Sequence, residues 1–286
     1  MTITFLGPRN TFSEKAAQVF AGACAPPAEL APAASFEAVA RAVGLAADTL
    51  GVLPYYNFLE GLIQESLDLI VEYDLRIADA CRVPISFAVG GWPDKENLVF
   101  SHPKALAQCS DFLRKHFPDA RLETVASTGD APASVARRGG GCAVASETAL
   151  ENAGLPILAR DIANKRHGMP NFTEFLLLSH GEGAAASRQP DGVMRTMVAV
   201  APDFDEPGLL ATILGQVAFH RINVAKIHSR PLFLEAAGDT EPQMFYLELM
   251  CPLRSPALAL CVESLRHRFG REEAVRLLGQ FPRLLP

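Results

Sequence analysis

The sequence has no long hydrophobic run, no excess of positive charge and no closely paired cysteines. No uninterrupted apolar stretch is long enough to cross a bilayer, so we expect no membrane partner. The start, Met1 to Asn10, lacks a basic region followed by a long apolar run, which indicates that there is no secretory signal. The formal net charge of −6 gives no general reason to expect a nucleic-acid partner.

The six cysteines are scattered, with no CxxC pair and no His–Cys spacing typical of a metal site. We therefore expect reduced, mostly buried thiols, a cytoplasmic protein and no structural metal. These cysteines are Cys24, Cys81, Cys109, Cys142, Cys251 and Cys261.

What is present is an alternation of short apolar strands and helical patterns. A chain of 286 residues, 49% hydrophobic and 20% charged, is ordinary for a globular protein of two domains or one large one. We expect strands at 2–6, 50–53, 84–89, 98–100, 122–125, 142–145 and 171–179, helices at 11–20, 35–43, 61–71 and 101–113 and another ending at 139–141, and a loop at 25–32. This order predicts an α/β fold with mainly parallel sheets covered by helices.

The pattern changes after a stretch rich in Gly, Ala and polar residues at Gly181–Gly192, which we interpret as a linker. Beyond it we expect strands at 194–201, 224–230 and 244–251, helices at 207–219 and 257–269, and a last short element near 275–278. This β-α-β-β-α order predicts a ferredoxin-like domain.

Three strand-to-helix turns carry hydroxyl side chains, around Thr11, Ser101 and Ser127. Helix starts offer free N–H groups and partial positive charge, and ligands of parallel sheets gather at such turns. The turns are therefore candidates for binding a small anion, although Ser and Thr are also common helix caps that serve only the helix.

The motifs become specific when they are taken together and in order. The chain resembles the prephenate dehydratase family in Leu6-Gly7-Pro8 with Thr11-Phe12-Ser13-Glu14, in Val52-Leu53-Pro54 with Asn57 and Glu60-Gly61, in the run from Ser101 to Cys109, in Ser127-Thr128 and Ala143-Val144-Ala145-Ser146, and in Asn171-Phe172-Thr173-Glu174-Phe175. Farther along, Pro207-Gly208-Leu209-Leu210 and the segment from Ile222 to Pro231 are similar to ACT regulatory domains.

The resemblance implies a domain plan. It implies a two-lobed catalytic region of the periplasmic-binding-protein type at 1–180, followed by a linker at 181–192 and a ferredoxin-like ACT domain at 193–280. Lobe one would comprise about 1–81 and 162–180, and lobe two about 82–161.

The resemblance also implies a reaction. The family removes carbon dioxide and water from prephenate to form phenylpyruvate, without metal or organic cofactor. Thr173 matches the threonine implicated at the leaving hydroxyl, where its O–H would donate a hydrogen bond. The resemblance implies substrate contacts at Thr11, Asn57, Ser101, Ser127, Thr128, Asn171 and Phe175; Phe175 is either a wall against the ring or strand core.

Two positions depart from the family pattern. Glu174 stands where the family has arginine, and Tyr56 stands where it has glutamate. We hypothesise a hydrogen bond between Tyr56 and Glu174 in place of an ion pair. The anionic ligand would then need another cation, for which Arg9, Lys165, Arg166 and His167 are candidates. The departures leave prephenate decarboxylase and arogenate dehydratase as alternative activities, with Glu174 as a partner for the arogenate ammonium.

The ACT resemblance implies phenylalanine as an effector and a homodimer or homotetramer as the assembly. The effector contacts would be Gly208, Leu209, Leu210, Asn223, His228 and Ser229. His228 stands where a glutamate is usual and lacks its fixed negative charge at neutral pH, so we expect weakened inhibition. A non-catalytic small-molecule-binding regulator is the alternative outside enzymology, because two lobes around a cleft also describe solute-binding folds.

Overall fold

The computed structural model describes every residue except 25, 166–168, 182–192, 232–241, 283 and 285–286. The chain forms two compact units: unit 1 comprises Met1–Leu69 and Cys81–Leu177, and unit 2 comprises Ile70–Ala80 and Leu178–Pro286. The expected boundaries at 180 and 193 stay predictions, and 182–192 of the expected linker lie outside the described residues. Within the described part, no helix has the length and apolar character needed to cross a membrane.

The first lobe of unit 1 is a sheet with strand order β11-β3-β1-β2. Strand β1 (Thr2–Leu6) pairs in parallel with both β2 (Glu29–Ala33) and β3 (Thr49–Asn57). Helices α1 (Phe12–Ala21) and α2 (Phe36–Leu45) connect these strands, and β4 (Gly61–Leu62), α3 (Gln64–Glu72) and β11 (Phe172–His180) follow. Ile3 and Phe5 are wholly buried, so this sheet has an apolar interior of its own.

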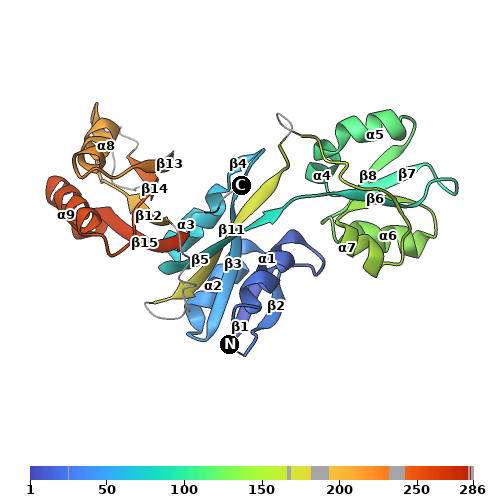
Figure 1. The fold of residues 1–286 in the computed structure, drawn as a ribbon, viewed down its shortest axis with the longest axis horizontal. Helices are drawn as coiled ribbons and strands as arrows, with labels where there is room; N and C mark the ends of the chain where they lie inside the picture. The colour runs from blue at the N-terminus through green and yellow to red at the C-terminus, as the bar shows by residue number, and fades with distance from the viewer. Residues whose placement is uncertain (25, 166–168, 182–192, 232–241, 283, 285–286) are drawn as a thin grey trace. The chain divides into compact units, whose positions relative to one another are not determined.

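The second lobe of unit 1 is a sheet covered by helices on both faces. Its strand order is β10-β6-β9-β7-β8, with β7 parallel to both β8 and β9. Helices α4 and α5 lie on one face and α6 and α7 on the other (Figure 1). The elements are β6 (Ala88–Trp92), β7 (Leu98–Ser101), α4 (Pro103–Gln108), α5 (Ser110–His116), β8 (Arg121–Thr124), α6 (Asp130–Arg138), β9 (Gly141–Ala145), α7 (Glu147–Asn152) and β10 (Ile157–Ala159).

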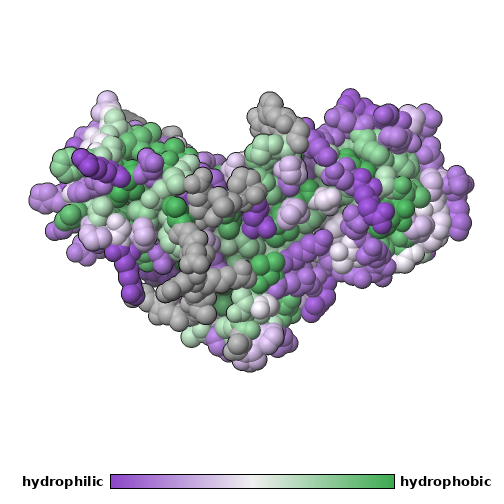
Figure 2. Space-filling view, viewed as in Figure 1, coloured by the Kyte–Doolittle hydropathy of each residue, from purple (hydrophilic) through white to green (hydrophobic). Residues whose placement is uncertain are grey.

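Alternation along β9 explains how this sheet is covered twice. Cys142 and Val144 pack in the cluster with α4 and α5, whereas Ala143 and Ala145 pack in the cluster with α6 and α7. Both faces are therefore apolar, as expected for a sheet buried between helices. Polar residues, with apolar ones scattered among them, cover the outer surface of this lobe in the view of Figure 2.

Unit 2 contains a β-α-β-β-α-β unit. Its elements are β12 (Met194–Val200), α8 (Leu209–Phe219), β13 (Val224–Pro231), β14 (Gln243–Leu249), α9 (Pro256–Phe269), a 3-10 turn (Glu272–Ala274) and β15 (Val275–Pro282). The strand order β13-β14-β12-β15 and the antiparallel pairing of β14 and β15 with β12 are those of a ferredoxin-like sheet. Ile213 of α8 and Leu258 of α9 lie in one apolar cluster with Val200 and Leu247.

Strand β5 (Leu75–Pro84) was missed in the sequence, where we expected a strand at 84–89 instead. Its first half belongs to unit 2, where Ile77 pairs in parallel with Gly279 of β15. Arg76 donates a hydrogen bond to the Leu277 carbonyl, at 3.2 Å, beside this pairing. Unit 2 is therefore completed by a segment that precedes it by about a hundred residues in the chain.

Three local expectations were wrong for identifiable reasons. The loop expected at 25–32 contains the start of β2, an edge strand in which Pro32 is tolerated because no ladder bond is needed on its open side. The helix expected from 101 to 113 is two helices, because the backbone at Cys109 leaves the helical region. The helix expected from 61 begins at Gln64, since Gly61 has φ of +89°.

Candidate active site

Asn57, at the end of β3, has a side-chain amide whose orientation is fixed by its neighbours. Its Oδ1 accepts hydrogen bonds from the backbone N–H groups of Leu59 and Glu60, at 2.9 and 3.0 Å. The nitrogen end must then point the other way, where Nδ2 donates to Thr173 Oγ1 at 2.9 Å and to the Phe172 carbonyl at 3.3 Å. Asn57 is therefore a buried donor with a defined direction.

Thr173, on β11, is buried and receives that hydrogen bond. A hydroxyl group has one proton and two acceptor lone pairs. Because Asn57 donates to one lone pair, the Thr173 proton is left for an acceptor other than Asn57. The two residues predicted to contact substrate from β3 and β11 are thus brought together as a donor pair.

A second polar group joins the lobes of unit 1. Asn171 Nδ2 lies 3.5 Å from Gln108 Oε1. Gln108 Nε2 and Lys104 Nζ donate to the two carboxylate oxygens of Glu60, at 2.8 and 2.9 Å. Asn171 is buried, and its Oδ1 has no hydrogen-bond partner in the described part of the chain. Such an acceptor is costly unless a ligand or water satisfies it.

Gln108, Lys104 and Glu60 were not among the residues predicted for the site. They lie inside the motifs that carried the resemblance, and their amide and charged side chains were the available signal. Burial raises the pKa of the Cys109 thiol, the next residue, to about 12. That thiol is neutral at physiological pH and is therefore unsuited to act as a nucleophile.

The first turn of lobe one lies against a turn of lobe two. A Cβ added to Gly129 would lie 2.9 Å from the Arg9 carbonyl oxygen, so the two backbones approach closely there. Thr11 caps α1 by accepting from the Glu14 N–H at 3.3 Å. Ser127 Oγ donates to the Asp130 carboxylate and accepts from the Asp130 N–H, and Thr128 follows Ser127 in the same turn. The predicted residues of these two turns are thus near one another, although Thr11 and Ser127 use their hydroxyls on their own helix starts.

Ser101 and Phe175 are the most enclosed of the predicted substrate contacts. Ser101 is fully buried, and its Oγ donates to the Val144 carbonyl at 2.6 Å. Phe175 is 2% exposed, which is the environment of a residue in the strand core. The predicted cations also have partners: Arg9 pairs with Glu14 and Lys165 pairs with Asp161, whereas 166 and 167 lie outside the described residues.

Glu174 has a cationic partner that the sequence did not reveal. Arg82, near the end of β5, donates to Glu174 Oε1 at 2.8 Å, and both side chains are largely buried. The same guanidinium lies 3.9 Å from the ring centroid of Phe172. The carboxylate at position 174 is therefore neutralised within unit 1, which weakens its case as a partner for a ligand ammonium.

The predicted effector residues lie around one helix and one strand of unit 2. Gly208 caps the start of α8, Leu209 is buried and Leu210 is 38% exposed. Asn223 precedes β13, and its carbonyl accepts from the Met250 N–H at 2.8 Å. His228 and Ser229 lie on β13 itself, paired with β14.

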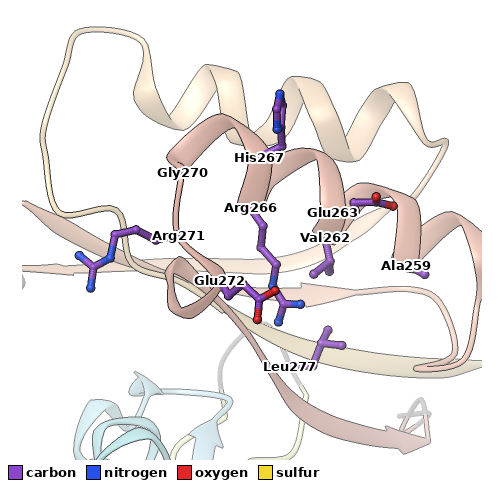
Figure 3. Close-up of a pocket in the computed structure, with 9 residues that line it drawn as sticks. All are labelled: Ala259, Val262, Glu263, Arg266, His267, Gly270, Arg271, Glu272 and Leu277. Atoms are coloured by element: carbon purple, nitrogen blue, oxygen red, sulfur yellow. The ribbon is translucent and has the colours of Figure 1, made fainter.

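Unit 2 also has an open pocket of about 630 Å³ between α9 and β15. Figure 3 shows that charged side chains surround it, with Val262 and Leu277 among them. Arg266 is already bonded to the Val275 carbonyl, at 2.9 Å, and Arg271 pairs with Asp203. The pocket contains none of the predicted site residues. In the described part of the chain, no three His, Cys, Asp or Glu side chains are grouped as a metal site.

Comparison with known proteins identifies the family. A model of the family described as Prephenate dehydratase matches residues 3–183. The chain belongs to the prephenate dehydratase family. A bifunctional chorismate mutase/prephenate dehydratase of Aquifex aeolicus is 31% identical, covering 99% of this chain and 74% of the relative. A prephenate dehydratase of Amycolatopsis methanolica is also 31% identical, covering 98% of this chain and 88% of the relative.

A solved structure agrees with the family assignment over nearly the whole chain. The crystal structure of a prephenate dehydratase from Arthrobacter aurescens in complex with L-Phe has a TM-score of 0.83 and 29% identity. The match covers 99% of this chain and 90% of that one. Two features of unit 1 are the most suited to holding a polar ligand. One is the Asn57–Thr173 pair, and the other is the polar cluster of Asn171, Gln108, Lys104 and Glu60.

Proposed function

We propose that the protein is a prephenate dehydratase, a carbon–oxygen lyase that converts prephenate to phenylpyruvate. The observation that carries the chemistry is the hydrogen bond from Asn57 to Thr173. Because Thr173 Oγ1 accepts from a fixed amide, its own proton is directed to a bound oxygen. The family match and the relatives of the same name support the same reaction.

The reaction needs only a positioned donor. In prephenate, the bond from the ring to the hydroxyl oxygen breaks, as does the bond from the ring to its carboxylate. The electron pair of the carboxylate bond enters the ring, carbon dioxide leaves, and the departing hydroxyl becomes water by taking the proton that Thr173 Oγ1 donates, which solvent then replaces. Aromatisation drives both cleavages, so a hydrogen bond from Thr173 at the leaving oxygen is sufficient help. Positioned proton transfer of this kind contributes about 10²–10⁴ in rate.

We further propose that the remaining polar groups of unit 1 bind the substrate carboxylates and keto group. Asn171 supplies a buried amide, and Gln108 and Lys104 supply donors that Glu60 now holds. Thr11, Ser101, Ser127, Thr128 and Phe175 stay proposed contacts.

We also propose that the C-terminal domain is an ACT domain that binds phenylalanine between subunits of a homodimer or homotetramer. The ferredoxin-like strand order and the relative crystallised with L-Phe support this. All six cysteines are free thiols, which suits our proposal of a cytoplasmic location.

The deciding experiment is to incubate the purified protein with prephenate and identify the products by mass and by the absorbance of the phenylpyruvate enolate. We expect phenylpyruvate from the wild type and a loss of about 10²–10⁴ in kcat for Thr173→Val, which keeps the shape but removes the hydroxyl. A dihydro product would indicate decarboxylation without aromatisation, turnover of arogenate alone would change the substrate, and no turnover of either would favour a binding protein.

A further inference from the structure

The charged pair Arg82–Glu174 is part of a larger arrangement of side chains, which we call the Phe172 stack. The Phe172 ring stacks on the Phe58 ring, with centroids 5.2 Å apart and planes inclined by 29°. Arg82 lies over Phe172 with its guanidinium carbon 3.9 Å from the centroid, and Tyr56 lies beside the same ring at 6.4 Å. Glu174 holds the guanidinium through a hydrogen bond of 2.8 Å. The five residues of the stack are Tyr56, Phe58, Arg82, Phe172 and Glu174.

The stack and the proposed catalytic pair lie on opposite faces of the same strands. Successive side chains of a strand alternate between faces, so Phe172 and Glu174 point to one face and Thr173 points to the other. Likewise Asn57 alternates with Tyr56 on β3. The stack therefore faces away from the Thr173 hydroxyl, so an effect of the stack on Thr173 passes through the backbone.

One peptide group joins the two faces. The Phe172 carbonyl accepts from the Phe58 N–H at 3.0 Å and from Asn57 Nδ2 at 3.3 Å. The ring that carries this peptide is clamped between Phe58 and Arg82. A shift of the Phe172 ring would thus move the carbonyl that helps to hold the Asn57 amide, and with it the donor that orients Thr173.

The charges make the clamp stiff. Arg82 and Glu174 have side chains that are 17% and 3% exposed, so water screens their attraction weakly. Arginine is suited to this place because its planar group stacks on a ring while donating in its own plane. A lysine would keep the charge but not the flat contact.

We propose that Arg82 and Glu174 are positioning residues for Thr173, acting through Phe172 and Asn57. This inference rests on the proposed function of the Asn57–Thr173 pair. It assigns a role to the two unusual residues, Tyr56 and Glu174, together with Phe58: they form a clamp behind the strand and are not contacts to the substrate.

The test is a double-mutant cycle in which kcat and KM are measured with prephenate as the substrate. Each variant is assayed well below its own melting temperature. We expect Glu174→Gln to lower kcat by about 10²-fold, the scale expected for a misplacement of about 1 Å, with KM little changed because no substrate contact is lost. Arg82→Lys should lower kcat to a similar extent, since it keeps the charge but loses the flat contact with Phe172. The matched control is Glu147→Gln, which breaks the exposed pair with Arg160 and should leave kcat unchanged.

The decisive comparison repeats Glu174→Gln in a Thr173→Ala background. A positioning role predicts almost no further loss of kcat there, because there is no hydroxyl left to orient. Equal losses in both backgrounds, or an unchanged kcat in Glu174→Gln, would overturn the proposal. If Glu174→Gln fails to fold, the double variant Arg82→Met with Glu174→Gln removes both charges of the pair and is put through the same cycle. A wild type that forms no phenylpyruvate would overturn the proposed function itself, a result separate from these.

Discussion

Asn57 and Thr173 are 116 residues apart in the chain, yet their side chains meet with Nδ2 and Oγ1 2.9 Å apart. The amide is turned toward the hydroxyl because two backbone N–H groups occupy its oxygen. This contact restricts the direction of the Thr173 proton, which cannot point toward Asn57.

The first prediction concerns the hydrogen bond from Asn57 to Thr173. Asn57→Asp keeps the shape and can still accept from the Leu59 and Glu60 N–H groups, but it cannot donate to Thr173. Thr173 would then donate its proton to the new carboxylate, so kcat for phenylpyruvate formation should fall by about 10²-fold or more. Asn97→Asp, at an amide whose hydrogen bond to the Asp119 carbonyl is exposed, is the control. An unchanged kcat in Asn57→Asp would contradict the proposed geometry.

The second prediction concerns the carboxylate between the lobes of unit 1. Glu60→Gln removes a negative charge that now engages Lys104 and Gln108. A substrate with two carboxylates should then bind more readily, with KM lowered by up to about fivefold, since exposed pairs contribute about 0.2–1 kcal/mol. Lys104→Gln should raise KM instead. The measurement is KM for prephenate from steady-state kinetics at low salt. A higher KM in Glu60→Gln would show that the Glu60 carboxylate does not oppose substrate binding.

The third prediction concerns the effector. His228→Glu restores a fixed negative charge on β13, which can pair with the ammonium group of phenylalanine. We expect the concentration for half-maximal inhibition to fall by about tenfold, equivalent to about 1.4 kcal/mol. Inhibition curves for the wild type, for His228→Glu and for the control His116→Glu in α5 measure this. Identical curves for all three would argue against His228 as an effector contact.

The fourth prediction concerns pH. Burial raises the pKa of the Cys109 thiol to about 12 and that of Cys142 to about 11. Unfolded thiols ionise near pH ~8.5, so between these values the folded chain binds more protons than the unfolded chain. The free energy of unfolding should therefore fall as pH rises, by about 1.4 kcal/mol per pH unit for each thiol.

Urea denaturation at pH 8 and pH 10 tests this. The pH slope, and not the stability itself, is the quantity to compare, because Cys109→Ala also leaves a small cavity. The slope should be shallower in Cys109→Ala and unchanged in Cys24→Ala, which alters a half-buried thiol near the end of α1. Equal slopes in the wild type and Cys109→Ala would show that Cys109 ionises in the folded protein.

The fifth prediction concerns backbone packing in unit 2. Gly279 has φ of +133°, and an added Cβ would lie 2.2 Å from the Ile77 carbonyl oxygen. Gly279→Ala should lower the free energy of unfolding by about 2–6 kcal/mol, from strain and overpacking together. Gly215→Ala in α8, where an added Cβ meets nothing within 4 Å, should instead stabilise by about 0.5–1 kcal/mol. Both are measured by thermal or urea unfolding.

Much of the fold was predictable because its local signals agree with one another. The cap at Thr11, the apolar strand after Thr2 and the change of pattern near Met194 all indicate elements that the structure contains. Strand β5 was missed because Asp79 stands on its buried side, where Leu75, Ile77, Cys81 and Val83 are apolar, and Asp79 is buried despite its charge. Strand β10 has only three residues, too few to show a period.

The candidate site was predictable only where a motif carried it. Asn57, Thr173 and Asn171 came from motif positions, whereas Arg82 did not, because its pairing with Glu174 depends on which strands become neighbours. The hypothesised Tyr56–Glu174 hydrogen bond stays a prediction, and it involved only β3 and β11, whereas the Arg82–Glu174 pair brings in β5. Local spacing holds no information about a partner 92 residues away.

The first half of β5 has a practical consequence for anyone who wishes to study the catalytic part in isolation. Its ladder partner, β15, lies at the far C-terminus, so a chain ended near residue 180 loses that partner while retaining residues 75–80. The cut would leave bare N–H and C=O groups along this segment, a template for pairing with other molecules. Such a fragment should be prone to aggregate, and a design that also replaces residues 70–80 with a short polar connection would be the sounder starting point.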